Sequence, residues 1–378
     1  MNFGFSEEQE LLRAEAERFL ETQVPMDRVR ELAASGPGHS PELWRQMGEL
    51  GWAGLLIPES EGGAGLGWLD AVVLLEVTGG RLLPSPLLSS LLASMALVEH
   101  GSSEQRARWL PALARGERAG TLALIEAPQS LAPERVTLAA EPWPGGGYRL
   151  AGEKRFVHDV AGADVFVVSA RSERGPVLGV LERGAEGLET HAAQSLDPTK
   201  CSGTLSLRAV HLGADAVLLE GEAAVSAQAR LLDAGALGCA AEMVGAAAAA
   251  HAMTVGYVKQ RLQFGQPIAR FQGVKHPLAE LHVAIETARS LVCYAGWALE
   301  SAPGEVPRAV SMAKAYAGEA LARMGEACIQ LHGAIGYTAE YDAQLYFKRS
   351  KWARPAFGDV NHHYERVAAL GGLAWTSA

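Results

Sequence analysis

The pattern of apolar and polar positions divides the chain into three segments, and the first of them, residues 1–120, reads as helical. In SEEQELLRAEAERFLETQV the apolar residues recur every three or four positions, and Ser6 stands where it can cap the first turn. A second periodic stretch, PELWRQMGEL, ends at Gly51. These patterns predict an N-terminal α-helical domain.

The second segment, residues 121–222, changes to short alternating or β-branched runs separated by Gly- and Pro-rich turns. The runs are TLALIEA, VTLAA, YRLAGEKRFVH, VFVVSAR, PVLGVLE and TLSLRAVHL. Such spacing is typical of an antiparallel β-domain, and PGGG at Pro144–Gly147 is most simply a hairpin turn. We therefore expect a middle β-domain.

The third segment, residues 223–378, returns to helical periodicity. The Ala- and Gly-rich run that starts near Ala227 extends beyond thirty residues, which suits one long helix of a bundle whose neighbours approach closely. Further helices are predicted at Leu278–Glu300, at Pro307–His332 and from about Ala343. The predicted fold class is α+β, with a helical domain, a β-domain and a C-terminal four-helix bundle.

Composition removes several classes of function. The 378 residues are 48% hydrophobic and 20% charged, with a net charge of −10 and no run of Lys or Arg, which argues against nucleic acid and against a basic membrane-binding face. The four cysteines lie far apart, without a CxxC pair, so neither a metal site nor a disulfide framework is expected. With no leader pattern and no membrane span predicted, we expect a cytoplasmic protein.

The glycine-rich stretch GGAGLG suggests a dinucleotide-binding loop, but its spacing does not match that motif. In GGAGLG the third required glycine, counted from Gly63, falls on Trp68, and no strand precedes the motif. A Rossmann loop is therefore excluded.

Four stretches together resemble the acyl-CoA dehydrogenase family. They are GELGWAGLLIPESEGGAGL, AGEKRFVHDVAGADVFVVSAR, RLQFGQPIARFQGVKHPLAEL and IQLHGAIGYTAEYDAQLYFKRSK, in the family's order and over nearly the whole chain. The resemblance implies FAD as cofactor, an acyl-CoA thioester as substrate and an electron-transfer flavoprotein as electron acceptor. It also implies that each FAD lies across a subunit interface.

The residues that the family offers to a neighbouring subunit's flavin match this chain. They are Arg261, Phe264, Gln272, Gln330 and Gly333. Their chemistry agrees, because a guanidinium suits a pyrophosphate, an amide suits an adenine edge, and glycine lets backbone come close to a ligand. Arg261 alone would be read as a surface salt bridge, but within its motif we favour cofactor contact.

The residues that would serve the chain's own flavin depart from the family. The loop motif that carries hydroxyls and an Asp aligns with IEAPQSLA, where Ile125, Leu131 and Ala132 stand at those positions. The stretch beside the flavin ring reads Phe156-Val157-His158 in place of Trp-Ile-Thr, and we expect His158 to fill space rather than to act as a base.

The largest departure concerns the catalytic base. The family's Glu-Gly-Thr aligns with Phe357-Gly358-Asp359, and a phenylalanine cannot accept the α-proton of a thioester. Asp233 and Glu242 are the acids nearest to the place, about Gly235, where some members carry a relocated Glu.

The adjacent residues His362 and His363 diverge by about 100° on a helix, which makes them poor ligands for one metal. We read both as surface or interface histidines, and we expect no metal site.

Three hypotheses remain open at this stage. In the first, the chain is the base-less subunit of an α2β2 acyl-CoA dehydrogenase, an arrangement known in bacterial sterol side-chain degradation, and contributes FAD contacts to a homologous catalytic partner. In the second, it is an active homo-oligomer with a relocated base. In the third, it is adapted to other chemistry or is a flavin-free structural subunit. The acyl group is not predictable from the sequence.

Overall fold

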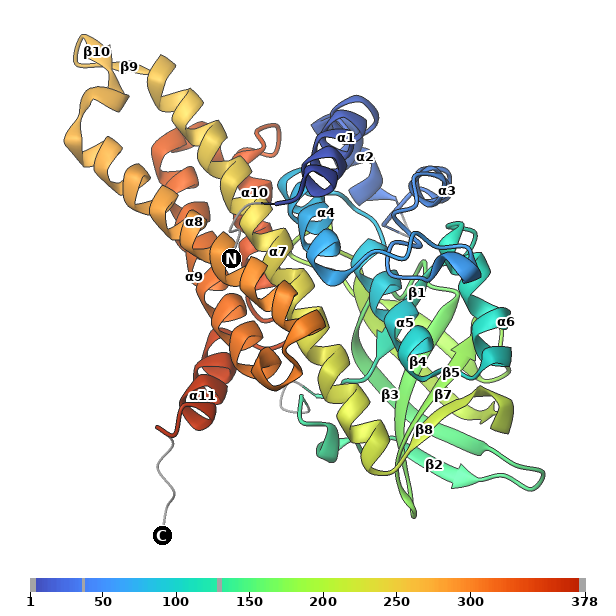
Figure 1. Cartoon of the computed structure of the whole chain (residues 1–378). Helices are drawn as coiled ribbons and strands as arrows, with labels where there is room; N and C mark the ends of the chain where they lie inside the picture. Colours follow the sequence, from blue (N-terminus) through green and yellow to red (C-terminus); the bar gives the residue numbers. More distant parts are fainter. Residues whose placement is uncertain (1–4, 36–37, 128–130, 374–378) are drawn as a thin grey trace. The chain divides into compact units, whose positions relative to one another are not determined.

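The computed structural model describes residues 5–35, 38–127 and 131–373, which form helices and one large sheet (Figure 1). The α-helices are α1 (Glu7–Gln23), α2 (Met26–Ala34), α3 (Pro41–Glu49), α4 (Trp68–Gly80), α5 (Leu87–His100), α6 (Ser103–Ala114), α7 (Glu222–Gln260), α8 (Gln272–Ser301), α9 (Val306–His332), α10 (Ala343–Ala353) and α11 (Val360–Leu370). The strands of the large sheet are β1 (Gly120–Ala123), β2 (Ala139–Pro142), β3 (Tyr148–His158), β4 (Val165–Ser172), β5 (Gly175–Glu182), β6 (Leu188–Ala192), β7 (Ser202–Leu212) and β8 (Val217–Glu220).

The chain divides into two compact units. The first contains residues 1–30, 68–83 and 236–378, and the second contains residues 31–67 and 84–235. Both units are discontinuous in sequence because α1 and α4 belong with the C-terminal helices, and the boundary after residue 235 divides α7 between the units. The fold class predicted from the sequence is confirmed, whereas the division into domains at residues 120 and 222 stays a prediction.

The second unit is built on the eight-stranded sheet, whose strands follow the order β6-β7-β3-β2-β4-β5-β8, with β1 also paired to β4. Most neighbours are antiparallel, as predicted, but β1 and β2 both pair parallel with β4, so the sheet is mixed. The glycine turn after Trp143 joins β2 to β3 as a hairpin, in agreement with the sequence. β6 and β8 were not predicted.

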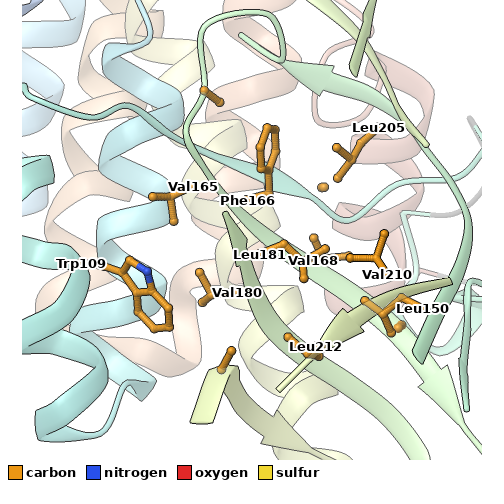
Figure 2. Close-up of a cluster of buried hydrophobic side chains, with 14 of the residues drawn as sticks. Trp109, Leu150, Val165, Phe166, Val168, Val180, Leu181, Leu205, Val210 and Leu212 are labelled. Atoms are coloured by element: carbon orange, nitrogen blue, oxygen red, sulfur yellow. The ribbon is translucent and has the colours of Figure 1, made fainter. Parts of the chain in front are cut away.

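A hydrophobic cluster fills the interior of this unit (Figure 2). Buried residues of β3, β4, β5 and β7 form it, and α6 adds the indole of Trp109. Phe166 and Leu205, for example, are fully buried. β4 and β5 are buried on both faces, so their sequences read as nearly continuous apolar runs, whereas the start of β3 alternates between buried and exposed residues.

The first unit is a helical bundle in which α9 packs against α8, α10 and α11, and α4 packs against α1 and α8. Close helix contacts depend on glycine. A Cβ added to Gly245 of α7 would lie 1.8 Å from the carbonyl oxygen of Glu76, and one added to Gly79 of α4 would lie 2.3 Å from that of Glu242. The small residues of α7 therefore bring α4 and α7 into contact at this point.

Among the described residues, α7 is the one helix long and apolar enough to cross a membrane by length and composition, and 89% of its apolar window is buried inside the protein. Its mean hydropathy is high because it contacts neighbours on most sides, as expected for the central helix of a bundle.

Candidate active site and cofactor contacts

The position aligned with the family's base lies in a tight loop between α10 and α11, which we call the 354–359 loop. Phe357 is 8% exposed and adopts a left-handed backbone conformation, with φ of 55°, and Gly358 follows with φ of 103°. Asp359 caps α11, because its carboxylate accepts a hydrogen bond of 2.8 Å from the backbone N–H of His362. Asp359 therefore has a local structural function that the sequence alignment did not indicate.

His363 is fully buried beneath this loop, and the prediction of a surface or interface histidine is wrong for it. Its Nε2 donates to the carbonyl of Phe357 at 3.1 Å. Burial, together with the positive charge of Lys314, lowers the pKa of His363 to about 3, so the ring is neutral at physiological pH. The imidazole thus works as a neutral hydrogen-bond donor to the backbone.

Replacing Gly358 by alanine is expected to destabilise the fold by about 2 kcal/mol or more. The added Cβ would require a strained backbone and would lie 2.7 and 2.8 Å from ring atoms of His362 and His363. Urea unfolding monitored by circular dichroism measures the change. The matched control is Gly256→Ala near the C-terminal end of α7, where the new methyl meets nothing within 4 Å and should stabilise the helix slightly.

Asp233 and Glu242, the substitute bases considered from the sequence, both lie on α7 and are 4% and 6% exposed. They are nine residues apart, so they face opposite sides of the helix and are separated by about 14 Å along its axis. Glu242 forms an ion pair of 3.9 Å with Arg349 of α10, and both side chains are buried. The two acids cannot serve one site together.

Three of the predicted cofactor residues lie at the tip of the α7–α8 hairpin (Figure 1), where a two-residue turn joins the short paired strands β9 (Leu262–Gln263) and β10 (Gln266–Pro267). Phe264 and Gly265 both have positive φ, as a type I′ turn requires, and the ring of Phe264 is 90% exposed. Arg261 and Gln272 flank the turn and are also exposed. The hairpin thus presents a cation, an aromatic ring and an amide to its surroundings.

The other two, Gln330 and Gly333, lie at the C-terminal end of α9. Gly333 has φ of 63°, and an added Cβ would meet nothing within 4 Å, so the backbone here is open to a ligand. Between them His332 is buried, with its ring centroid 4.4 Å from that of Tyr257 on α7. This contact joins the end of α9 to the last turns of α7, close to Arg261.

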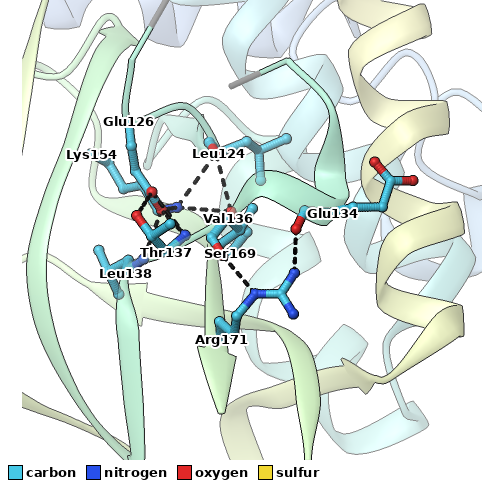
Figure 3. Close-up of polar contacts among 9 residues, drawn as sticks. All are labelled: Leu124, Glu126, Glu134, Val136, Thr137, Leu138, Lys154, Ser169 and Arg171. Carbon is cyan, nitrogen blue, oxygen red and sulfur yellow. Dashed lines mark hydrogen bonds and ion pairs between the residues drawn. The ribbon is translucent and has the colours of Figure 1, made fainter. Parts of the chain in front are cut away.

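A polar network in the second unit holds the loop that follows β1 (Figure 3). The carboxylate of Glu126 accepts hydrogen bonds from the ammonium of Lys154 at 2.6 Å, from the hydroxyl of Thr137 at 2.5 Å and from the backbone N–H groups of Thr137 and Leu138. Lys154 also donates to Ser169 at 3.0 Å. The loop aligned with the family's flavin-contacting motif is therefore fastened to the sheet just before residues 128–130, which lie outside the described residues.

Glu126 and Lys154 differ in burial, so their surroundings affect the two pKa values differently. Burial lowers the pKa of Lys154 to about 8, despite the opposing charge of Glu126, because its side chain is fully buried. Burial alone would raise the pKa of Glu126, but this carboxylate is 14% exposed, and Lys154 with the other donors lowers its pKa overall.

Because of the Glu126–Lys154 ion pair, we expect the stability of the folded protein to depend on pH. Because the pKa of Glu126 is lowered in the folded state, its contribution is present above the unfolded pKa of about 4.3 and is lost as the pH falls through the folded pKa. Glu126→Gln should therefore be less stable than the wild type at pH 6–7, and the difference should shrink below about pH 4. Thermal unfolding of both proteins across this range measures it. An offset that stays constant with pH would contradict the ion pair.

The residues aligned beside the flavin ring lie at the end of β3. Phe156 is 49% exposed with φ of 54°, whereas Val157 is buried, and the register of β3 shifts at this point. Burial and then the charge of Lys200 lower the pKa of His158 to about 3, so its imidazole is neutral. Its role beside a flavin stays a prediction.

Sequence reasoning missed Glu126, Lys154 and Lys314. A signal for each lysine exists in the pattern. Lys154 has the same parity on β3 as the buried residues Tyr148 and Leu150, and Lys314 lies one helical turn after buried Val310. A lysine on an otherwise apolar face is rare unless it is paired.

Comparison with known proteins agrees with this architecture. The model of the acyl-CoA dehydrogenase N-terminal domain matches residues 6–117, and that of the acyl-CoA dehydrogenase C-terminal domain matches residues 225–370. The acyl-CoA dehydrogenase IpdE2 of Mycolicibacterium smegmatis is 33% identical over 96% of this chain and 99% of its own length.

Solved structures give the same result. The Tcur3481-Tcur3483 steroid ACAD superposes with a TM-score of 0.88 at 32% identity, over 97% of this chain and 98% of that one. The ChsE4-ChsE5 complex from Mycobacterium tuberculosis superposes with a TM-score of 0.91 at 26% identity over the whole of both chains. The fold and the motif regions are those of a family of flavoprotein oxidoreductases. The chain belongs to the acyl-CoA dehydrogenase family.

Proposed function

We propose that this chain is the base-less subunit of an α2β2 acyl-CoA dehydrogenase and contributes FAD contacts to a homologous catalytic partner. Phe357 carries the proposal. A benzyl group has no lone pair and no relevant pKa, so it cannot remove the α-proton of an acyl-CoA thioester. When bound, FAD supplies the hydride acceptor for α,β-desaturation, but the proton must leave to a base that this loop lacks.

The surroundings of the candidate substitutes support the same conclusion. The Arg349 guanidinium lies 3.9 Å from the Glu242 carboxylate, which favours a structural ion pair over a base that must reach a substrate. Asp233 is buried on the opposite side of α7.

The residues proposed to hold the partner's flavin fit that group. Arg261, Gln272, Gln330 and Gly333 are all exposed, together with Phe264, whose ring has few contacts within the chain. A guanidinium and two amides suit a pyrophosphate and a nucleoside, and an exposed aromatic ring suits a subunit interface. The residues proposed for the chain's own flavin fit less well, because Ile125, Leu131 and Ala132 offer no side-chain hydrogen bonds.

The comparisons bear on partner and substrate. Two of the similar structures carry names that join two components, and one of them is called a steroid ACAD. This favours a heteromeric assembly and, as acyl-CoA class, a steroid-derived thioester. A cytoplasmic location and an electron-transfer flavoprotein as acceptor complete the proposal by family resemblance.

The test compares the purified chain alone with the chain co-expressed beside a family member that carries the missing Glu. The chain alone should be colourless and inactive with steroid-CoA and an artificial electron acceptor. The co-purified complex should show the absorbance of bound FAD and reduce the acceptor. A yellow homomer that desaturates acyl-CoA at an ordinary rate would instead establish the active homo-oligomer, and a complex that never binds FAD would establish a structural subunit.

A further inference from the structure

The side chain of Lys314 donates all of its hydrogen bonds to the backbone in and beside one loop. It lies on α9 and is 1% exposed. Its ammonium donates to the carbonyls of Ala353 at 3.2 Å, Arg354 at 3.1 Å and Gly358 at 3.0 Å. A lysine has three N–H donors, so all of them bind backbone at the two ends of the 354–359 loop.

This arrangement is costly for the protein. A buried ammonium loses its hydration, and burial accordingly lowers the pKa of Lys314. In the described part of the chain no carboxylate forms an ion pair with it, although the charge of Asp359 opposes the shift. The carbonyl oxygens therefore provide the compensation, and the loop and the lysine stabilise each other.

Other contacts hold the loop through its backbone and through its side chains, among them an ion pair of 2.6 Å between Arg354 and Glu319 of α9. His363 donates to the carbonyl of Phe357 at 3.1 Å, and the thiol of Cys239 on α7 lies 3.6 Å from the carbonyl of Ala353. Phe357 has φ of 55°, a conformation that a residue with a Cβ adopts only when its surroundings impose it. The hydrogen bonds from Lys314 and His363 all end on backbone carbonyls, so a change of side chain at position 357 leaves their donors and acceptors in place.

We infer that Lys314 is a positioning residue, which fixes the backbone at position 357 through the carbonyls on either side of it. The backbone conformation at the position aligned with the family's base is then kept, although the residue there is a phenylalanine. The interpretation of position 357 as a former base position rests on the proposed function, but the three hydrogen bonds from Lys314 do not depend on it.

Hydrogen–deuterium exchange on the full-length isolated chain tests the inference. The amides of Arg354, Gly358 and His363 are hydrogen-bonded in the structure and report on the loop. In Lys314→Met, peptides covering residues 354–363 should exchange roughly tenfold faster or more, because three charge-assisted hydrogen bonds are lost. Peptides of β4 and β5 in the other unit should be unchanged.

Two further variants separate positioning from general stabilisation. Lys314→Arg keeps a cation with several donors and should restore most of the protection. Phe357→Glu should leave exchange over residues 354–363 within about twofold of the wild type. Lys351→Met, which removes an exposed lysine of α10, is the matched control and should have no effect on the loop.

The inference fails if Lys314→Met leaves the loop protected, or if Phe357→Glu loosens it as much as the lysine variant does. Should Lys314→Met not fold, Lys314→Gln and Phe357→Glu decide in the same way. The assay needs neither flavin nor partner. An isolated chain that desaturated acyl-CoA would overturn the proposed function and leave the exchange result standing.

Discussion

Replacing Arg261 by alanine is expected to weaken FAD binding to the assembled complex about ten- to a hundredfold. A guanidinium that binds a pyrophosphate makes charge-assisted hydrogen bonds worth about 1.5–3 kcal/mol, and 1.4 kcal/mol corresponds to a factor of ten. Arg261 is exposed at the α7–α8 hairpin and adjoins the turn of Phe264 and Gly265. Titration of FAD into the apo-complex, followed by quenching of flavin fluorescence, measures the affinity.

The control for this experiment is Arg208→Ala. Arg208 is an arginine of the same charge on β7, 72% exposed and paired with Glu189 in the other unit. Its removal should leave flavin affinity unchanged. If the Arg261 variant binds FAD as tightly as the Arg208 variant, the α7–α8 hairpin does not bind the cofactor. The proposal that this chain contributes FAD contacts to a partner subunit would then be wrong.

Replacing Lys154 by methionine is expected to destabilise the protein by about 3–5 kcal/mol, because it leaves the carboxylate of Glu126 partly buried without its counter-charge. The ammonium is fully buried and lies 2.6 Å from that carboxylate. The loop after β1 should loosen first, since Glu126 is its attachment to β3. Urea unfolding gives the free energy, and limited proteolysis reports on the loop.

Two control variants show whether the loss comes from the buried ion pair. Lys351→Met removes a lysine paired with Glu326 at 3.1 Å on the surface, where the loss should be within about 0.5 kcal/mol. The double variant Glu126→Gln and Lys154→Met should be more stable than Lys154→Met alone, because no uncompensated charge remains. Equal losses for the buried and the exposed lysine would show that the network in Figure 3 contributes little.

Much of the architecture was predictable because local patterns carry it. The opening of YRLAGEKRFVH alternates, and the first residues of β3 follow this pattern, with Tyr148 and Leu150 buried and Arg149 and Ala151 exposed. The Ala- and Gly-rich run specified a helix of more than thirty residues, and α7 has 39. The parallel pairing of β1 and β2 with β4 was not predictable, because strand direction depends on which distant segments meet.

The candidate residues illustrate the same limit. The motifs identified Arg261, Phe264, Gln272, Gln330 and Gly333, and the structure adds that Tyr257 and His332 join the ends of the two helices concerned. His363 was misread as a surface residue, because one helical turn does not reveal what packs against it.

The family, the order of the helical and β segments and the phenylalanine where a carboxylate is expected can all be read from the chain, because these properties are local or depend on the order of motifs. The partners of the buried charges follow from three-dimensional packing: Lys154 is compensated by Glu126, and Lys314 by three backbone carbonyls in and beside the 354–359 loop, some forty residues away. A buried charge is stable only with a partner in space, and the linear chain does not name that partner.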